Sequence, residues 1–289
     1  MPMTDVLAIC VCYHNDDEVA TFVRGVVSQQ AALRKQVLVV NNSDRQYSCP
    51  QTKAVLQDSG GLILEPGRNL GYYGAAHCAY CWYTTVNARP EWVLVSNTDV
   101  ELAGDFFEKL RLLHSEEPPA VLAPALVSEV YGVDQNPFMA SHPGRLWLHL
   151  KRWMLASTPS YEFFVSASKM RWRLRGQWPR QAKEAPGTPY QIFAPHGALA
   201  LFHRRYFEVG GSLEPPTFMY TEEMMVAETA RRHRLSILYD PRLRARHHHR
   251  KPGAANGALA EYQREAAAYI THVYFPLLRW PGRRGPSVL

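Results

Sequence analysis

The chain has 289 residues, of which 46% are hydrophobic and 20% are charged, a composition that excludes an intrinsically disordered protein. No uncharged apolar run reaches the roughly 18 residues that a membrane-spanning helix needs, so any membrane contact is expected to be peripheral. The formal net charge of +6 and the pI near 9.1 favour an anionic partner, which could be a nucleotide, a phospholipid headgroup or a nucleic acid.

The N-terminal residues and the cysteines bear on the compartment. The segment MPMTDVLAICVCYHNDDEV lacks the basic-then-apolar pattern of a secretory signal and enters a strand-like run almost at once. The five cysteines form an odd set without a disulfide framework, as expected in a reducing compartment. A zinc site built from Cys10, Cys12, Cys78 and Cys81 is an alternative, although small buried thiols are common in strands. We therefore expect a cytoplasmic protein.

Strands and helices are expected to alternate over the first 128 residues. The apolar run 6–12 predicts a strand, and Asp16 or Asp17 is expected to cap the amphipathic helix that follows it. Further strands are predicted at 36–40, 62–64, 92–95 and 120–126, and further helices at 75–86 and 104–114. This alternation favours a parallel sheet, whose ligands gather at the carboxyl ends of its strands.

Polar clusters follow three of these predicted strands. The segment 41–44 follows the second strand, Arg68 and Asn69 follow the third, and 97–99 follows the fourth. Because the carboxyl ends of parallel strands meet at one edge of a sheet, these clusters are expected to lie close together. The first half of the chain therefore has the pattern of a nucleotide-binding layer.

Two later regions combine basic and aromatic residues. Between Arg145 and Arg180 the sequence has eight Lys or Arg residues and one acid, interleaved with Trp and Phe, and the tail from Tyr262 to Leu289 is similar. This pattern is typical of a segment that lies in a lipid headgroup layer, although a basic flap that packs on the domain fits it as well. No nucleic-acid-binding motif accompanies it, so nucleic acid is not an expected partner.

Three groups of residues carry candidate chemistry. Asp99 ends a strand, where a carboxylate can coordinate a cation that bridges two phosphates, although such an Asp can also cap a helix. Glu222 and Glu223 precede a helix predicted at 224–234, where acids also simply complement the helix dipole. His247 belongs to a histidine run, a feature that is commonly just solvated. A short strand at 235–239 and a turn at Asp240-Pro241 are predicted before that run.

The order of the motifs carries a family resemblance. The matching residues are Tyr13, Val39–Asn42, Asn69–Tyr72, Asn97–Asp99, Gly197-Ala198, Gly210-Gly211, Phe218–Glu223, Tyr239–Pro241 and His247. Together they resemble the inverting family 2 glycosyltransferases with the GT-A fold, most closely the rhamnosyltransferase-like branch. The resemblance covers roughly residues 5–128 and 190–250. Its most specific parts are the NxGxxxA-like segment before Asp99 and the paired acids after the Pro215-Pro216-Thr217 turn.

This resemblance implies an α/β fold with a Rossmann-like, mostly parallel central sheet and flanking helices, to which a basic aromatic helical insertion and a helical tail are added. The expected divisions are a nucleotide-sugar-binding half at 1–128, the insertion at 129–189, an acceptor and catalytic half at 190–250, and a membrane-proximal tail at 251–289. The implied activity is inverting transfer of a sugar from a nucleoside-diphosphate donor to a saccharide acceptor.

The resemblance also implies roles for single residues. Asp99 and His247 would bind Mg²⁺ or Mn²⁺, and Glu223, with Glu222 beside it, would be the general base that takes the proton of the acceptor hydroxyl. The donor-binding residues would be Tyr13, Asn41, Arg68, Asn69, Gly71 and Asn97. His196 and Gly197 are expected on the acceptor side, because loops of this kind set specificity by their shape.

The sequence departs from the family pattern at the base contact and at the acids. Asn41 stands where the family usually has Asp, which leaves the choice between uracil and thymine open, and Glu223 is one methylene longer than the usual Asp. We therefore expect dTDP-rhamnose or a UDP-hexose as donor and a saccharide acceptor, lipid-linked at the inner face of the cytoplasmic membrane, in surface polysaccharide synthesis. The alternative is a catalytically inactive GT-A-fold protein that binds partners at the membrane surface.

Overall fold

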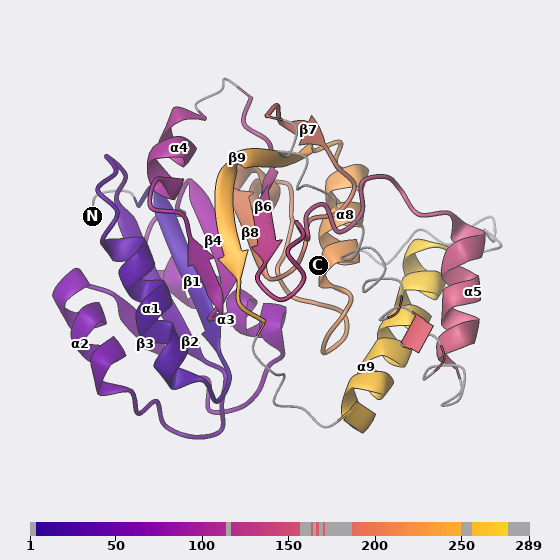
Figure 1. Cartoon of the computed structure of the whole chain (residues 1–289), viewed down its shortest axis with the longest axis horizontal. Coiled ribbons are helices and arrows are strands. Elements are labelled where there is room, and N and C mark those ends of the chain that lie inside the picture. Colours follow the sequence, from indigo (N-terminus) through magenta and orange to yellow (C-terminus); the bar gives the residue numbers. More distant parts are fainter. Residues whose placement is uncertain are drawn as a thin grey trace.

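The computed structural model describes residues 4–113, 117–156, 163, 166–167, 170, 187–249 and 256–276. Within these residues, a nine-stranded sheet runs in the order β3-β2-β1-β4-β8-β6-β9-β5, and β7 pairs with β9 (Figure 1). The strands are β1 Val6–Cys12, β2 Lys35–Asn41, β3 Leu62–Leu64, β4 Trp92–Asn97, β5 Val100–Leu102, β6 Val121–Ser128, β7 Tyr190–Gln191, β8 Leu199–His203 and β9 Ile237–His247.

Helices cover both faces of this sheet. They are α1 Asp16–Val27, α2 Pro50–Ser59, α3 Tyr72–Val86, α4 Phe106–Leu112, α5 Arg145–Leu155, α7 Arg204–Glu208, α8 Glu222–Arg232 and α9 Asn256–Tyr269, which continues into the π-helical turn η1 Ile270–Tyr274. Most of the predicted elements are present, with bounds that differ by a few residues at their ends.

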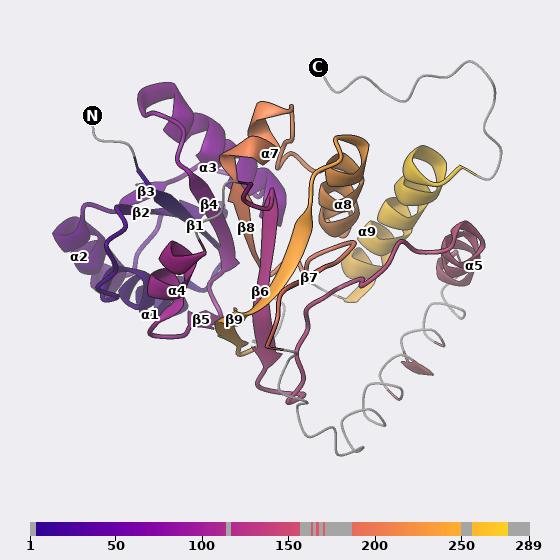
Figure 2. The ribbon, with the colours of Figure 1, turned by 90° about the horizontal axis from the view of Figure 1, so that it is seen from above.

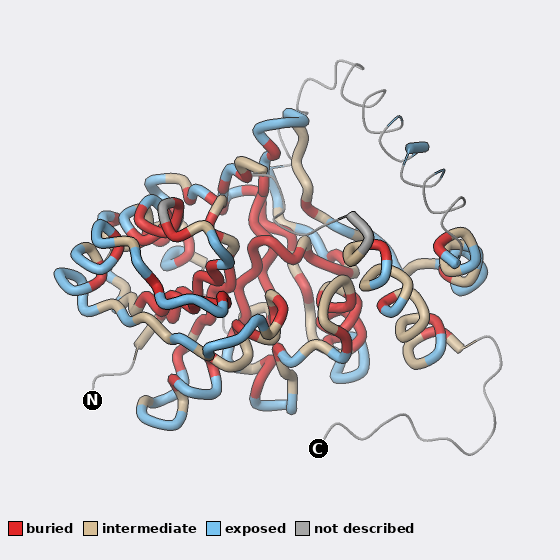
Figure 3. The backbone as a smooth tube through the Cα atoms, turned by 90° about the horizontal axis from the view of Figure 1, so that it is seen from below, coloured by how far each residue is buried: buried red, intermediate tan, exposed pale blue. Residues whose placement is uncertain are grey.

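The sheet forms the core because its central strands are apolar on both sides. All seven residues of β1 are buried. Alternate side chains of a strand point to opposite faces, so Leu7 and Ile9 pack with α3, α7 and α8, whereas Ala8 and Cys10 pack with α1, α2 and α4. Figure 3 shows this buried centre between more exposed helices. The continuous apolar run of β1 is thus explained by cover on both faces.

The pairing of the strands is mixed. β1–β2, β2–β3, β1–β4 and β6–β9 are parallel, whereas β4–β8, β6–β8, β5–β9 and β7–β9 are antiparallel. The expected α/β fold with a central sheet and flanking helices is confirmed, but the sheet is less parallel than the sequence predicted. The reason is that β8 enters beside β4 in the opposite direction, so residues 1–128 and 190–250 share one sheet.

The expected capping of α1 by Asp16 or Asp17 is wrong. The helix begins at Asp16, so both residues lie in its first turn, and Asn15 occupies the cap position without a side-chain capping bond. The carboxylate of Asp16 is instead engaged by Ser48, whose N–H and hydroxyl both donate to it at 3.3 and 3.2 Å. A tertiary contact therefore takes the place of a local one.

The turn expected at Asp240-Pro241 is also absent. β9 runs through these residues to His247, and its pairing with β6 becomes irregular between Asp240 and Arg244. A proline is tolerated at such an irregularity because its missing N–H interrupts no regular pair. As a result, β9 is long enough to carry His247 to the carboxyl edge of the parallel strands.

Residues 145–155 of the predicted insertion form α5, which lies beside α9 at the end of the molecule away from β1–β3 (Figure 2). Leu148 packs with Met224 and Phe275 in a small buried cluster, and His149 Nε2 lies 2.9 Å from the carbonyl oxygen of Phe275. Other basic or aromatic residues of these regions lie outside the described residues: Phe164, Trp172, Trp178, Arg279, Trp280, Arg283 and Arg284. Within the described ranges, no helix is long and apolar enough to cross a membrane.

Candidate active site

The carboxyl ends of three parallel strands lie side by side. Cys12 of β1 is paired with Asn41 of β2, and Val11 is paired with Asn97 of β4. The polar residues that follow these strands therefore emerge at one edge of the sheet, which is where open α/β sheets bind their ligands. β5 continues from this edge and pairs with the end of β9, so that Val100 lies opposite His247.

This pairing brings Asp99 and His247 together from distant parts of the sequence. Asp99 Oδ1 lies 3.3 Å from His247 Nε2, and the N–H of His248 donates to the carbonyl oxygen of Asp99 at 2.9 Å. His247 Nδ1 lies 2.7 Å from Gln135 Oε1, so a proton on Nδ1 would donate to this amide oxygen and leave the Nε2 lone pair for a cation.

These two side chains fit a divalent cation. A carboxylate oxygen and an imidazole nitrogen that is oriented by a second hydrogen bond form a common pair of metal ligands, and both groups are nearly buried. No cluster of three or more His, Cys, Asp or Glu ligands occurs among the residues that the structure describes. Asp99 and His247 would hold such a cation through one carboxylate oxygen and one imidazole nitrogen.

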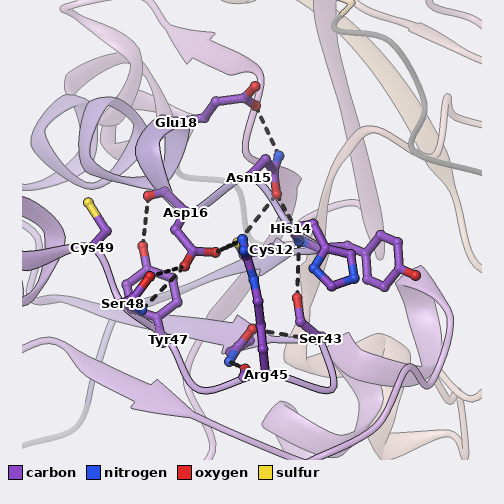
Figure 4. Close-up of polar contacts among 12 residues, drawn as sticks. Cys12, His14, Asn15, Asp16, Glu18, Ser43, Arg45, Tyr47, Ser48 and Cys49 are labelled. Atoms are coloured by element: carbon purple, nitrogen blue, oxygen red, sulfur yellow. Dashed lines mark hydrogen bonds and ion pairs between the residues drawn. The ribbon is translucent and has the colours of Figure 1, made fainter.

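A polar network at the start of α1 fixes the loop that carries Asp99, and Figure 4 shows the part of it formed by Asn15 and Glu18. The buried carboxylate of Glu18 accepts hydrogen bonds from Asn15 Nδ2 at 3.0 Å and from Thr98 Oγ1 at 3.0 Å, and Asn15 also contacts Thr98. Thr98 is the neighbour of Asp99 in the chain, so the start of α1 holds the position of the candidate metal ligand. Sequence patterns carried no indication of this network, because Thr98 lies 80 residues from Glu18 in the chain.

The predicted donor-binding residues occupy the same edge of the sheet but differ in what their side chains do. Tyr13 is 41% exposed at the end of β1, so its ring is accessible. Asn41 is turned inward, where its amide donates to the carbonyl oxygen of Arg45 and to the carboxylate of Glu65. Contact between Asn41 and a nucleobase remains a prediction. Asn97 lies nearby, and its N–H donates to the carbonyl oxygen of Ala198 at 3.0 Å.

The loop that contains Arg68, Asn69 and Gly71 is organised by Asn42. The Asn42 side chain accepts from the N–H of Leu70 at 2.7 Å and donates to Asn69 Oδ1 at 2.9 Å. Gly71 has a φ of +74°, and a Cβ at this position would collide with the carbonyl oxygen of Phe218. A glycine is therefore required there, both for the left-handed backbone and for the close approach of the chain before α8. Arg68 is exposed on this loop.

Glu222 and Glu223 begin α8; Glu222 is buried, and Glu223 is partly buried, with its carboxyl group enclosed by protein atoms. Burial and the neighbouring Glu223 carboxylate raise the pKa of Glu222 to about 8, and burial also raises the pKa of Glu223. The N–H of Gly197, which donates to the Glu223 carboxylate, and the ammonium of Lys151 both act to lower that pKa. The Oε2 atom of Glu222 and the hydroxyl of Tyr73 are buried, and neither has a hydrogen-bond partner among the residues that the structure describes. This set of groups suits proton transfer near neutral pH.

The segment 196–198 connects the two parts of the site. A Cβ on Gly197 would lie 2.9 Å from Glu223 Oε1, so this glycine allows the acid to approach the backbone. On the other side, the ring centroid of His196 lies 6.1 Å from that of His247, and its Nε2 is 3.4 Å from Gln135 Nε2. Burial and the two neighbouring histidines lower the pKa of His196 to about 4, which favours a neutral ring.

Several residues of this site were not predicted. Gln135 and Lys151 lie within the segment interpreted as an insertion, yet one orients His247 and the other acts electrostatically on Glu223. The residues around Gln135 lie against the sheet through the pairs Val127–Asp134 and Met139–Ala194. Amides and lysines are abundant surface residues, so their types alone carried no signal for these roles.

No family model matches the chain, and no curated protein matches it either. Among solved structures, it superposes on the crystal structure of GalNAc-T7 with UDP, GalNAc and Mn²⁺ with a TM-score of 0.62 and 12% sequence identity. The match covers 94% of this chain and 50% of that chain, so this chain spans about half the length of its structural neighbour. At this identity the likeness shows the fold alone: the chain has the GT-A glycosyltransferase fold.

Proposed function

We propose that this protein is a metal-dependent glycosyltransferase that moves a sugar from a nucleoside-diphosphate donor to a saccharide acceptor. The observation that carries the proposal is the placement of two chemically different groups at one edge of the sheet. Asp99 and His247, whose Oδ1 and Nε2 atoms lie 3.3 Å apart, form one group, and the adjacent acids Glu222 and Glu223 form the other. Segment 196–198 contacts both groups. Sugar transfer requires two such groups, one that holds a cation at the leaving diphosphate and one that takes the proton of the acceptor hydroxyl.

The proposed reaction is an inverting, single displacement. The acceptor oxygen bonds to the anomeric carbon while the bond from that carbon to the diphosphate breaks, and the proton of the acceptor hydroxyl passes to the Glu223 carboxylate. Asp99 and His247 would hold Mg²⁺ or Mn²⁺, and the chemistry supplied by such a cation when bound is neutralisation of charge on the leaving diphosphate. Gly197 fixes the orientation of Glu223 through its N–H.

The remaining donor-binding residues support this arrangement by their positions. The accessible ring of Tyr13 offers a surface for a base, and hydrogen bonds from Asn42 hold the loop of Arg68, Asn69 and Gly71 in place. For the donor we retain dTDP-rhamnose and a UDP-hexose as alternatives. The UDP bound in the GalNAc-T7 structure favours the second.

The first experiment is a donor panel. The protein is incubated with Mn²⁺ and a set of UDP- and dTDP-sugars, with and without saccharide acceptors, and released nucleoside diphosphate is measured. We expect release from one donor class that stops when EDTA is added, and an inverted anomeric configuration in the product by NMR. Retention in the product would exclude the single displacement. Silence across the panel with acceptors supplied would favour the second candidate, an inactive GT-A-fold protein that binds partners.

We further propose that the acceptor is lipid-linked and that the protein lies peripherally on the inner face of the cytoplasmic membrane, where surface polysaccharide precursors are made. The support is α5, which turns four large apolar side chains outward although it also contacts the core through Leu148. Their exposed fractions are 79% for Leu146, 48% for Trp147, 52% for Leu150 and 71% for Trp153. The helix contains basic residues and no acid, which suits an anionic lipid surface.

The substitution Trp153→Glu tests this surface. Because burying a large apolar side chain contributes about 1.5–3 kcal/mol, we expect the partition coefficient onto anionic vesicles to fall about tenfold or more. Val86→Glu is the matched control, since Val86 is 62% exposed on a different helix. Sedimentation with vesicles measures both variants. Equal binding of the two variants, or equal recovery of the wild type with neutral and anionic vesicles, would contradict the proposal.

A further inference from the structure

Beside the Asp99–His247 pair lies a buried nitrogen that lacks a hydrogen-bond partner in the part of the chain that the structure describes. It is Nε2 of His249, and no partner for this atom is present among the described residues although it is shielded from solvent. Buried polar atoms in folded proteins are nearly always hydrogen-bonded, because an unpaired one forfeits its interaction with water. An orphaned ring nitrogen next to a candidate ligand site is therefore a reason to ask what it binds.

The ring of His249 is held against the candidate metal pair. Its centroid lies 3.9 Å from that of His247 with an interplanar angle of 29°, and the ring of Tyr131 contacts it edge-on at 5.6 Å. Asp99 is close enough to act electrostatically on the His249 ring. The imidazole of His249 is therefore stacked on the ring that, with Asp99, would bind a cation.

The neighbouring histidine behaves differently. His248 Nδ1 lies 2.6 Å from Glu129 Oε2, and its Nε2 lies 3.2 Å from Glu101 Oε2, so both ring nitrogens have carboxylate partners. Alternate residues of an extended chain point in opposite directions, which is why His247 and His249 share one side and His248 the other. His249 completes this placement with a φ of +50°, a left-handed conformation that side chains other than glycine seldom adopt.

We propose that His249 is a donor-binding residue whose Nε2–H donates a hydrogen bond to the diphosphate of the nucleotide. This inference rests on the proposed function and adds a residue to it. A neutral imidazole can carry its proton on Nε2, and a phosphate oxygen at the Asp99–His247 pair is an acceptor that bears charge. The bond assists departure of the nucleoside diphosphate, because negative charge on its oxygens increases as the bond to the sugar breaks.

The test is binding rather than turnover. Calorimetric titrations in the presence of Mn²⁺ compare UDP and dTDP with the corresponding monophosphates, using the wild type, His249→Ala and His248→Ala. Hydrogen bonds to charged groups are strong, so we expect His249→Ala to raise the Kd of the diphosphate about 10- to 100-fold. The Kd of the monophosphate is expected to change less than about threefold, and His248→Ala is expected to bind both nucleotides like the wild type. His249→Gln, which retains an N–H donor, should recover part of the loss.

One further measurement, together with these titrations, distinguishes the outcomes. Binding of Mn²⁺ alone, followed by electron paramagnetic resonance, should be the same in His249→Ala and the wild type, and a fall in Mn²⁺ affinity would overturn the diphosphate role in favour of metal ligation. Equal loss for monophosphate and diphosphate, or no loss for either, would also overturn it. In those cases the wild type still binds nucleotide and the proposed function stands. If the wild type binds neither UDP nor dTDP, the proposed function itself fails and this role fails with it.

Discussion

Replacing Glu223 by glutamine is expected to lower kcat for sugar transfer by about 10²- to 10⁴-fold, the usual contribution of a general base. Glutamine has nearly the same shape as glutamate but cannot take a proton from the acceptor hydroxyl. The amide can still lie beside Gly197, because this glycine has no side chain in the way. A Cβ at position 197 would lie only 2.9 Å from Glu223 Oε1. The substitution should therefore remove the chemistry with little change in packing.

Steady-state kinetics at saturating donor measure this effect, with Glu208→Gln as the matched control. Glu208 ends α7 and is an exposed acid that forms an ion pair with Arg204 at 3.9 Å, away from the site. Its substitution should leave kcat within about a factor of two, because exposed ion pairs contribute little. If Glu223→Gln transferred sugar at the rate of the Glu208→Gln variant, Glu223 would not be the base.

The pH dependence follows from the same pair of acids. Burial raises the pKa of Glu223 above its ordinary value of about 4.3, and the adjacent Glu222, whose pKa is about 8, is mostly protonated at neutral pH. A general base must be ionised, so kcat/KM should rise with pH as Glu223 loses its proton and level off above its pKa. The expected rise lies above the range of an exposed glutamate, and Glu223→Gln should abolish it.

Hydrophobic periodicity predicted most of the fold because the core is built from local patterns. β1 and β2 are continuous apolar runs, and α1 has apolar residues spaced on one face, so their burial could be predicted from neighbours in the sequence. The direction of β8 and the passage of β9 through Pro241 could not be predicted this way. They depend on which strands become neighbours, and that is decided by packing across the whole sheet.

The residues of the candidate site also fall into those that the sequence could predict and those that it could not. Asp99, Glu223 and His247 were predicted as site residues because each residue type is chemically distinctive and their order resembles a known family pattern. Gln135 was not predicted, and Asn42 was matched only as the end of the segment Val39–Asn42, with no role of its own. Yet Gln135 orients His247 and Asn42 holds the loop at Gly71. Supporting amides are recognisable only by their partners, which lie 112 and 29 residues away in the chain.

Asp99→Asn is expected to lower metal-dependent transfer by about a hundredfold to a thousandfold, since a bound cation contributes several kcal/mol to charge stabilisation. Asparagine keeps the size of the side chain and leaves the backbone bond from His248 N–H to the carbonyl oxygen of residue 99 intact. It removes the negative charge, and an amide oxygen is a weaker ligand for a hard cation. His247 would remain as a ligand.

The variant should therefore need a higher Mn²⁺ concentration for half-maximal activity, and raising Mn²⁺ should restore part of the lost rate. Activity measured against Mn²⁺ concentration, together with Mn²⁺ affinity from electron paramagnetic resonance, checks both effects, and Asp58→Asn on the exposed surface of α2 is the control. Unchanged Mn²⁺ affinity would place the cation elsewhere. A cation that stabilises the leaving diphosphate makes the transfer rate depend on Mn²⁺ affinity. A fall in Mn²⁺ affinity without a fall in transfer rate would therefore mean that Asp99 binds a cation that the reaction does not use.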